Sequence, residues 1–190
     1  MDLQEVIIFA RNNYLSLPSA TITEKTLDFI YERLRGFYLE KSITPQIFNA
    51  VLARQPTNLL DFDERIKAVI NFNKLPEAES LATANKRVSN ILQKSGAFIE
   101  EEVHAKLLIE VAEKELLEQI YRKETMLDKL LLNRQYIKIL ELLADLKPFI
   151  DTFFAEVMVM VEDKKIRANR LALLLRLRKL FLYCADISML

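Results

Sequence analysis

The chain has 190 residues, of which 51% are apolar and two are glycine. This length fits one domain of ordinary size, with a core that needs no disulfide or metal to stabilise it. Basic and acidic residues are equal in number, which excludes a uniformly cationic nucleic-acid-binding protein but leaves room for a local basic patch.

Scarce glycine and abundant Leu, Glu and Lys predict an all-α protein. Apolar spacing in the first half of the chain predicts helices at residues 3–12, 24–41, 45–54, 61–73 and 77–94. Thr23 and Asp61 are interpreted as N-caps, Pro45 as a first-turn proline and Gly96 as a C-terminal stop. Residues 16–20 are expected to form a loop.

The second half is predicted to be helical as well. We expect an acidic helix at 98–123, with Val111 on its inner side, and a helix at 126–145 with a break near Asn133. Another helix should begin at residues 147–148 and end before Glu162. Its last part, Val157–Val161, alternates Val and Met, but its flanks favour a helix. Gly36, inside the predicted 24–41 helix, is expected to permit a close packing contact.

The last predicted helix, from Asp163 to Ala185, is apolar around most of its circumference. Such a helix belongs inside a bundle, surrounded by other helices. Seven Lys or Arg residues and no acid lie between Asp163 and Asp186, so its outer edge should be positive. We therefore predict an all-α helical bundle organised around a long, mostly buried C-terminal helix, with Asp163 as its N-cap.

Cellular context follows from the ends of the chain and from its single cysteine. Cys184 lies in the apolar last helix and is interpreted as a buried free thiol, which fits a reducing compartment. The first ten residues lack the basic start of a signal peptide, and the apolar runs are too short to span a membrane. We expect a soluble cytoplasmic protein without a membrane partner.

No constellation for catalysis or metal binding is found. His104 is the one histidine, and a surface or packing role is its expected interpretation. One Cys and one His cannot build a common zinc site, and two isolated glycines cannot form a phosphate-binding loop. The run from Glu100 to Glu102 is interpreted as a solvated first helical turn. We expect no catalytic residue and no metal ligand.

Binding is the better-supported activity. Leu81 to Ile99 carries three basic residues and no acid. Within it, Asn85, Lys86, Arg87 and Asn90 lie around one predicted helix. Lys and Arg pair with phosphates, and Asn can read the edges of bases in an unpaired loop. The alternative is that this basic face is simply solvated.

Four other basic residues are candidates for the same patch: Arg65 and Lys67 in the preceding helix, and Arg167 and Arg170 in the last one. The first two would widen the patch if the two helices pack side by side. The last two could instead pair with acidic residues of the chain. Aromatic side chains could stack on bases, although core packing is the favoured interpretation for Tyr31, Tyr38 and Phe72.

Several longer segments resemble one family. These are LDFIYERLRGFY from Leu27, AVLAR from Ala50, DFDERIKAV from Asp61, ANKRVSNIL from Ala84, and the whole stretch from Val157 to Leu190. Together they are similar to the C-terminal part of the bacterial glycyl-tRNA synthetase β subunit, over residues 20–190 and in the same order. The motifs around Asn85–Asn90 and Arg167–Arg170 fall inside this resemblance.

The resemblance implies a division into an N-terminal helix and linker at 1–20 and a helical, DALR-like anticodon-binding domain at 21–190. It implies glycine tRNA, the synthetase α subunit and the rest of β as partners, with no DNA. In that family the α subunit uses ATP and Mg²⁺ to activate glycine, as a class II synthetase. This fragment of the ligase is therefore expected to hold no cofactor and to be non-catalytic by itself.

Two rival functions stay open from the residues. The chain could be a helical docking module of the synthetase, with the acidic Glu100–Glu118 segment and the basic helices binding protein and no tRNA. A hydrolase with an unrecognised site is a third possibility, against which the lone histidine and the missing nucleophile motifs argue.

Overall fold

The computed structural model describes residues 2–13, 21–96 and 99–190. Within these ranges the protein is all-α, without a strand, which confirms the predicted fold class. An isolated bridge between Asp2 and Asn58 is the one β-type pairing among the described residues. The helices are α1 (Leu3–Asn12), α2 (Ile22–Glu40), α3 (Pro45–Leu52), α4 (Leu59–Phe72), α5 (Ala78–Ser95), η1 (Ala105–Leu107), α6 (Val111–Leu132), α7 (Tyr136–Ala144), α8 (Lys147–Glu156), α9 (Lys164–Leu182) and η2 (Ile187–Met189).

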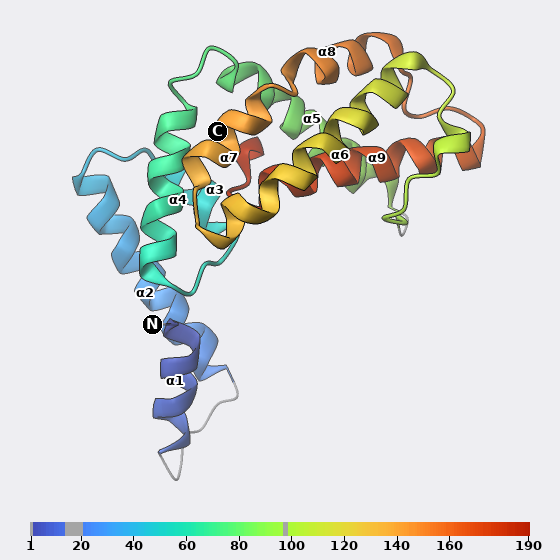
Figure 1. Cartoon of the computed structure of the whole chain (residues 1–190). Coiled ribbons are helices and arrows are strands. Elements are labelled where there is room, and N and C mark those ends of the chain that lie inside the picture. Colours follow the sequence, from blue (N-terminus) through green and yellow to red (C-terminus); the bar gives the residue numbers. More distant parts are fainter. Residues whose placement is uncertain (1, 14–20, 97–98) are drawn as a thin grey trace.

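Helix α9 lies among the other helices of the second half of the chain (Figure 1). It packs against α5, α6 and α7, while α8 packs against α6 and α5. Helix α4 packs against α7 and α3, and α2 joins the bundle through α3. The short helix η2, after α9, contacts α5 and α3 and thereby connects the end of the chain to its first half.

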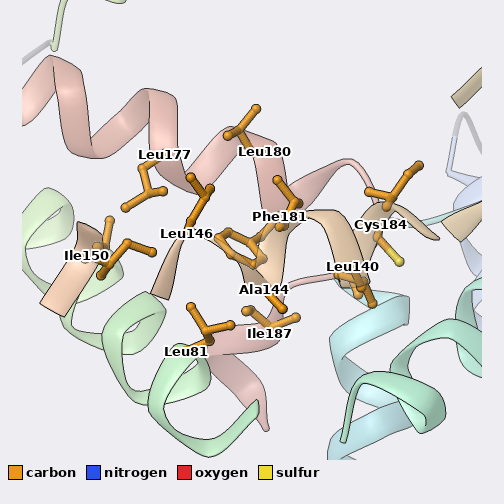
Figure 2. Packing of buried hydrophobic residues seen from close by; sticks show 14 of the residues in the cluster. Leu81, Leu140, Ala144, Leu146, Ile150, Leu177, Leu180, Phe181, Cys184 and Ile187 are labelled. Carbon is orange, nitrogen blue, oxygen red and sulfur yellow. The ribbon is translucent and has the colours of Figure 1, made fainter. Parts of the chain in front are cut away.

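One apolar core runs through the bundle. Nine of the 19 residues of α9 are buried, among them Leu177, Leu180 and Phe181. Figure 2 shows these side chains together with Leu81 of α5 and Ile150 of α8. Each such buried side chain stabilises the fold by about 1.5–3 kcal/mol relative to its exposure. Residues 169–174 are all buried, and six consecutive residues cover the whole circumference of a helix, which explains why α9 lacks a single apolar stripe.

Several predicted helix ends are confirmed. The carboxylate of Asp163 accepts the N–H groups of Lys165 and Ile166 at 2.8 and 3.1 Å and so caps α9. Gly96 ends α5 with a φ of +59°, a left-handed conformation that favours glycine. Pro45 opens α3. The expected break near Asn133 separates α6 from α7.

Two predicted N-caps are wrong. Helix α2 begins at Ile22, so Thr23 lies inside it and is buried. Helix α4 begins at Leu59, where the side chain of Asn58 accepts the N–H groups of Leu60 and Asp61. Asn is as good a cap as Asp, and the carboxylate of Asp61 binds other side chains.

The predicted helix at 98–123 is wrong for its first part. Residues 99–110 are irregular apart from η1, and α6 begins at Val111, which is exposed. Helix α6 then continues to Leu132, in agreement with the helical pattern that was predicted to continue from Met126. Glu113 explains the start, because its carboxylate accepts the N–H groups of Ile109 and Glu110 at 2.8 Å and caps the helix there.

Residues 157–161 are also not helical, contrary to the prediction, because α8 ends at Glu156. Val157 and Val159 are buried, whereas Met158 and Met160 are exposed. This alternation has the period of two that is typical of an extended chain, although the backbone bends at Val159 and Met160. The local pattern therefore outweighed the helical flanks.

The predicted loop at 16–20 and the predicted domain boundary after residue 20 fall outside the described residues, and both stay predictions. None of the helices in the described ranges combines the length and the apolar character that a membrane span requires.

Gly36 does not permit a close contact, contrary to the prediction: a Cβ atom built there would meet nothing within 4 Å. The helical conformation of α2 suits alanine better than glycine. We expect Gly36→Ala to raise the free energy of unfolding by about 0.5–1 kcal/mol, measured by urea denaturation. Gly96→Ala is the matched control and should lower it by about 1 kcal/mol, because its positive φ disfavours a side chain. Equal effects of the two substitutions would contradict this interpretation.

Candidate nucleic-acid interface

The outer side of α5 carries an uncompensated positive surface. Lys86, Arg87, Asn90 and Lys94 are all exposed, and we call them the α5 face. They lie on neighbouring turns at spacings of three, four or eight residues, which places them along one side of a helix. Within the described residues, Lys86, Lys94 and Asn90 donate no side-chain hydrogen bond and form no ion pair. The predicted cluster of Lys86, Arg87 and Asn90 is therefore on one accessible surface.

Arg87 has an aromatic neighbour from α8. Its guanidinium carbon lies 4.2 Å from the ring centroid of Phe154, within the range of a cation–π contact. Phe154 is half-buried, so this contact orients Arg87 without removing its hydrogen-bond donors from solvent. The arrangement offers a phosphate a positioned, planar donor group.

A hollow of about 400 Å³ continues this surface beyond the end of α5. It is lined by Ser95 of α5, by Met160, and by Lys164 and Arg167 of the first turn of α9. Arg167 is half-buried and donates to the carbonyl of Val161 at 3.2 Å. The structure thus brings one predicted residue of the last helix next to the end of α5.

Asn85 faces the opposite way from the α5 face. It is 2% exposed, and its side-chain amide donates to the carbonyl of Leu81 at 3.0 Å. Leu81 and Val88, four residues before it and three after it, are buried on the same side of the helix. Asn85 is therefore a hydrogen-bonded core residue in this structure.

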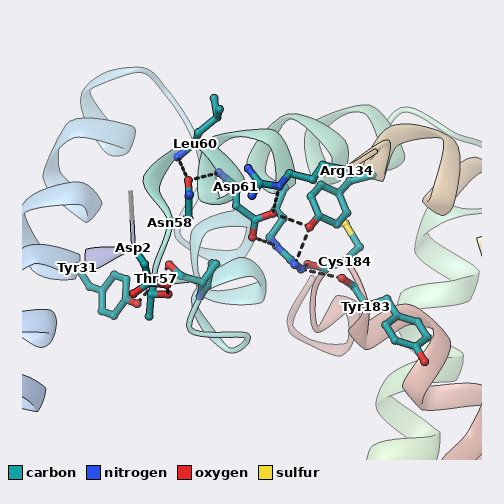
Figure 3. A network of polar contacts seen from close by, with 12 residues as sticks. Asp2, Tyr31, Thr57, Asn58, Leu60, Asp61, Arg134, Tyr183 and Cys184 are labelled. Atoms are coloured by element: carbon teal, nitrogen blue, oxygen red, sulfur yellow. Dashed lines mark hydrogen bonds and ion pairs between the residues drawn. The ribbon is translucent and has the colours of Figure 1, made fainter. Parts of the chain in front are cut away.

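Arg65 is the centre of an internal polar network (Figure 3). Its guanidinium donates to Asp61, to the hydroxyl of Tyr136, and to the carbonyls of Tyr183 and Cys184, at distances of 2.6–2.8 Å. Its side chain is 15% exposed. Helix α4 packs mainly against α7 and α3, so α4 and α5 do not form the widened patch that Arg65 and Lys67 would require.

Burial of this network changes the pKa values of two of its side chains. Burial and the hydrogen bond to Asp61 raise the pKa of Tyr136. Burial also raises the pKa of the Cys184 thiol to about 12. Both groups therefore stay neutral at physiological pH. The charged groups of the network meet at Asp61, whose carboxylate lies 2.7 Å from Arg65 and 3.8 Å from Arg134. The end of the chain is tied down nearby, since the N–H of Asp186 donates to the carbonyl of Ala50 at 2.8 Å.

Lys67 is exposed but paired. Its ammonium lies 2.7 Å from the carboxylate of Asp63 one turn earlier, and this hydrogen bond raises the pKa of Lys67. Asp63 also accepts the hydroxyl of Tyr38 at 3.0 Å. Tyr31, Tyr38 and Phe72 are buried, as core packing requires, and none of them presents a ring for stacking.

Arg170 is buried in an ion pair. Its side chain donates to the carboxylate of Glu113 at 2.7 Å and to the carbonyl of Met158 at 2.8 Å. The two side chains are 5% and 0% exposed. Arg170 therefore joins α9, the start of α6 and the non-helical segment 157–161. Of the alternatives for this residue, the structure places it in ion pairing with the acidic region.

The positive edge expected for α9 is confined to its first turn. Arg176, Arg178 and Lys179 pair with Glu124, Asp186 and Glu101. Lys164 and Lys165 are exposed and form no ion pair among the described residues.

Sequence reasoning missed Lys94 and Lys164 as members of the surface. Lys94 follows Lys86 and Asn90 at spacings of eight and four residues, so its helical position was a usable signal. The place of Lys164 on this surface could be found only from the fold, because no spacing in the sequence indicates that the first turn of α9 lies beside the end of α5. Among the described residues, no group of three or more His, Cys, Asp or Glu side chains is arranged to hold a metal ion.

The family described as "DALR anticodon binding domain" matches residues 81–187, which is more than half of the chain. The chain belongs to this family. The matched region runs from α5 to η2 and includes the α5 face, the hollow and the buried pair of Arg170 with Glu113.

Curated relatives agree with this assignment. The chain is 47% identical over 192 residues to the glycine–tRNA ligase β subunit of Coxiella burnetii, which covers all of this chain and 28% of that relative. It is 46% identical over 191 residues to the β subunit of Marinobacter nauticus, with the same shares. The Pseudomonas aeruginosa β subunit is 47% identical over 172 residues, covering 90% of this chain and 25% of the relative. The chain thus spans about a quarter of the length of these relatives.

The buried ion pair of this DALR domain has a measurable consequence. We expect Arg170→Ala to lower the free energy of unfolding by about 3–5 kcal/mol, because it leaves Glu113 buried without a counter-charge. Lys165→Ala, at an exposed and unpaired position, is the control and should change stability by less than about 0.5 kcal/mol. The double variant Arg170→Met with Glu113→Gln should recover part of the loss. Urea denaturation measures all three, and equal stability of Arg170→Ala and the control would contradict the assigned role.

Proposed function

We propose that this chain is the anticodon-binding region of a glycine–tRNA ligase β subunit, and that it binds the anticodon arm of a glycine tRNA. The observation that carries the proposal is the family match at 81–187, together with relatives whose printed function is that of the β subunit of this ligase. The α5 face supports it, because it is the kind of uncompensated basic surface that a phosphate backbone requires.

The α5 face and the hollow would bind different parts of the RNA. Lys86, Arg87 and Lys94 would contact phosphates, which position an RNA without reading its sequence. Asn90 presents an amide that can donate to and accept from a base edge. Lys164 and Arg167 would extend the phosphate track past the end of α5.

Four predicted contacts are less suited to this role. Arg65, Asn85 and Arg170 have their polar groups engaged inside the protein, and Lys67 is paired with Asp63. We propose that these residues support the surface. Of the residues predicted from the sequence, Lys86, Arg87, Asn90 and Arg167 would then make the direct contacts, beside Lys94 and Lys164.

The remaining parts of the reaction would lie elsewhere. In the proposed holoenzyme, a class II synthetase, the α subunit would bind ATP and Mg²⁺ and activate glycine, while this chain and the rest of β would hold the tRNA in the cytoplasm. The present chain would then be non-catalytic and free of cofactors. Its family membership supports this division, because an anticodon binding domain is named for tRNA recognition.

The first experiment measures binding of the chain to a glycine tRNA transcript at two salt concentrations, beside the same transcript with altered anticodon bases. Binding that weakens with salt, and weakens further with the altered anticodon, is the expected result. Equal binding of both transcripts would reduce the function to phosphate binding. Absence of binding to either would favour the docking-module function.

The double variant Lys86→Ala with Arg87→Ala tests the site. We expect a loss of tRNA affinity of roughly tenfold or more, since charge-assisted hydrogen bonds contribute about 1.5–3 kcal/mol each. The slope of log affinity against log salt should fall by about 1 for each phosphate contact removed. Fluorescence anisotropy at several salt concentrations measures both.

The control is Lys129→Ala with Lys138→Ala, which removes two exposed cations from α6 and α7. It changes the net charge equally but leaves the α5 face intact, so affinity should change little. An equal loss in both double variants would indicate a general charge effect. Unchanged affinity in the first variant would overturn the site assignment and leave the family assignment standing.

A further inference from the structure

Helices α1 and α2, which precede the matched DALR region, expose large apolar side chains. Phe9 is 73% exposed, Phe29 59% and Phe37 47%, and Val6 and Leu39 are each 43% exposed. Isolated apolar residues on a surface are common, whereas a contiguous group of them points to an interaction site.

The exposed phenylalanines of α2 follow a regular pattern. Lys25, Phe29, Arg33, Phe37 and Lys41 recur at four-residue intervals and are all exposed. The Arg33 guanidinium lies 5.0 Å from the centroid of the Phe29 ring, and the Lys41 ammonium lies 4.0 Å from that of Phe37. These cations form no ion pair among the described residues. The result is an apolar ridge edged with positive charge.

The two helices are held in place while this side stays uncovered. Helix α1 packs mainly against α2, and its start is fixed by the N–H of Leu3, which donates to the carbonyl of Thr57 at 2.9 Å. Figure 1 shows both helices extending away from the bundle that α5 to α9 form. The ridge is therefore a preformed surface.

The greater length of the relatives indicates a partner for the ridge of α2. Nearly three quarters of the length of the Coxiella burnetii β subunit lies outside the region that this chain matches. We propose that the exposed side of α1 and α2 binds that remaining part of a β subunit, through an apolar surface that carries carboxylates opposite Lys25, Arg33 and Lys41. This inference rests on the β-subunit identity in the proposed function and is independent of tRNA binding.

The charges of α2 favour protein over RNA as the occupant. Glu24, Asp28, Glu32 and Glu40 are exposed along the row next to the ridge. These carboxylates would repel a phosphate backbone, whereas a protein surface can place polar or basic groups beside them. The α5 face, by contrast, has no acid between Leu81 and Ser95.

A chimera tests the proposal. The matched region of the Coxiella burnetii β subunit is replaced by this chain, and hydrogen exchange of residues 3–12 and 22–40 is compared between the chimera and the chain alone. We expect the amides of both helices to exchange at least tenfold more slowly in the chimera. Equal exchange rates would overturn the proposal.

Variants locate the contact. Phe29→Ser with Phe37→Ser should restore fast exchange of α1 and α2 in the chimera, and it should leave the far-ultraviolet circular dichroism of the chain alone unchanged. Leu132→Ser, at an 86% exposed position at the end of α6, is the control and should leave the protection intact. Protection that survives the double Phe variant would overturn the assignment of the ridge.

Two further measurements on the chain alone distinguish other occupants. Protection of α1 and α2 that rises with the concentration of the chain would indicate a second copy, and protection on addition of glycine tRNA would indicate RNA. Either result, without protection in the chimera, would replace the proposal. If tRNA did not bind at the α5 face, the proposal for α1 and α2 would still stand. Failures of the two proposals can therefore be told apart.

Discussion

The second half of the structure depends on one buried ion pair, that of Arg170 with Glu113. Arg170 lies in the buried part of α9, residues 169–174. An arginine there must meet an acid, because an unpaired buried charge costs several kcal/mol. Glu113 meets it, and the same carboxylate accepts the two amides that precede α6. Arg170 also holds the carbonyl of Met158. One contact therefore sets where α6 begins, how α9 lies against it, and the course of the chain between α8 and α9.

The cations proposed to contact tRNA are those that form no ion pair inside the protein. Arg65 and Arg170 donate to carbonyls and carboxylates inside the protein. Ion pairs with acids of other segments neutralise Arg176, Arg178 and Lys179. The cations of α5, and Lys164 and Lys165 in the first turn of α9, have no such partner among the described residues. Zero net charge thus coexists with a locally positive surface, because most acids are already paired or lie on other helices.

Much of this could be predicted from the sequence, and the rest could not for physical reasons. Helix existence, the Asp163 cap and the Gly96 stop depend on neighbouring residues, which a sequence displays directly. The inward position of Asn85 was also readable, because it shares its helical side with Leu81 and Val88. The pairing of Arg170 with Glu113 spans 57 residues and leaves no local trace. The end of α8 before residues 157–161 was indicated by the Val–Met alternation, but the helical flanks favoured a longer helix.

The anchoring of the chain's end has a consequence for where this protein can be divided. Arg65 of α4 binds the carbonyls that follow α9, and Ala50 of α3 binds the amide of Asp186. Both contacts cross from outside the recognised family region into it, and so does the core that α3 and α4 share with η2 and α7. The region that the family match covers, residues 81–187, is therefore smaller than the packed unit to which it belongs. A transplant of the recognised segment alone would carry the α5 face but would leave behind the helices that keep the segment's last residues in place.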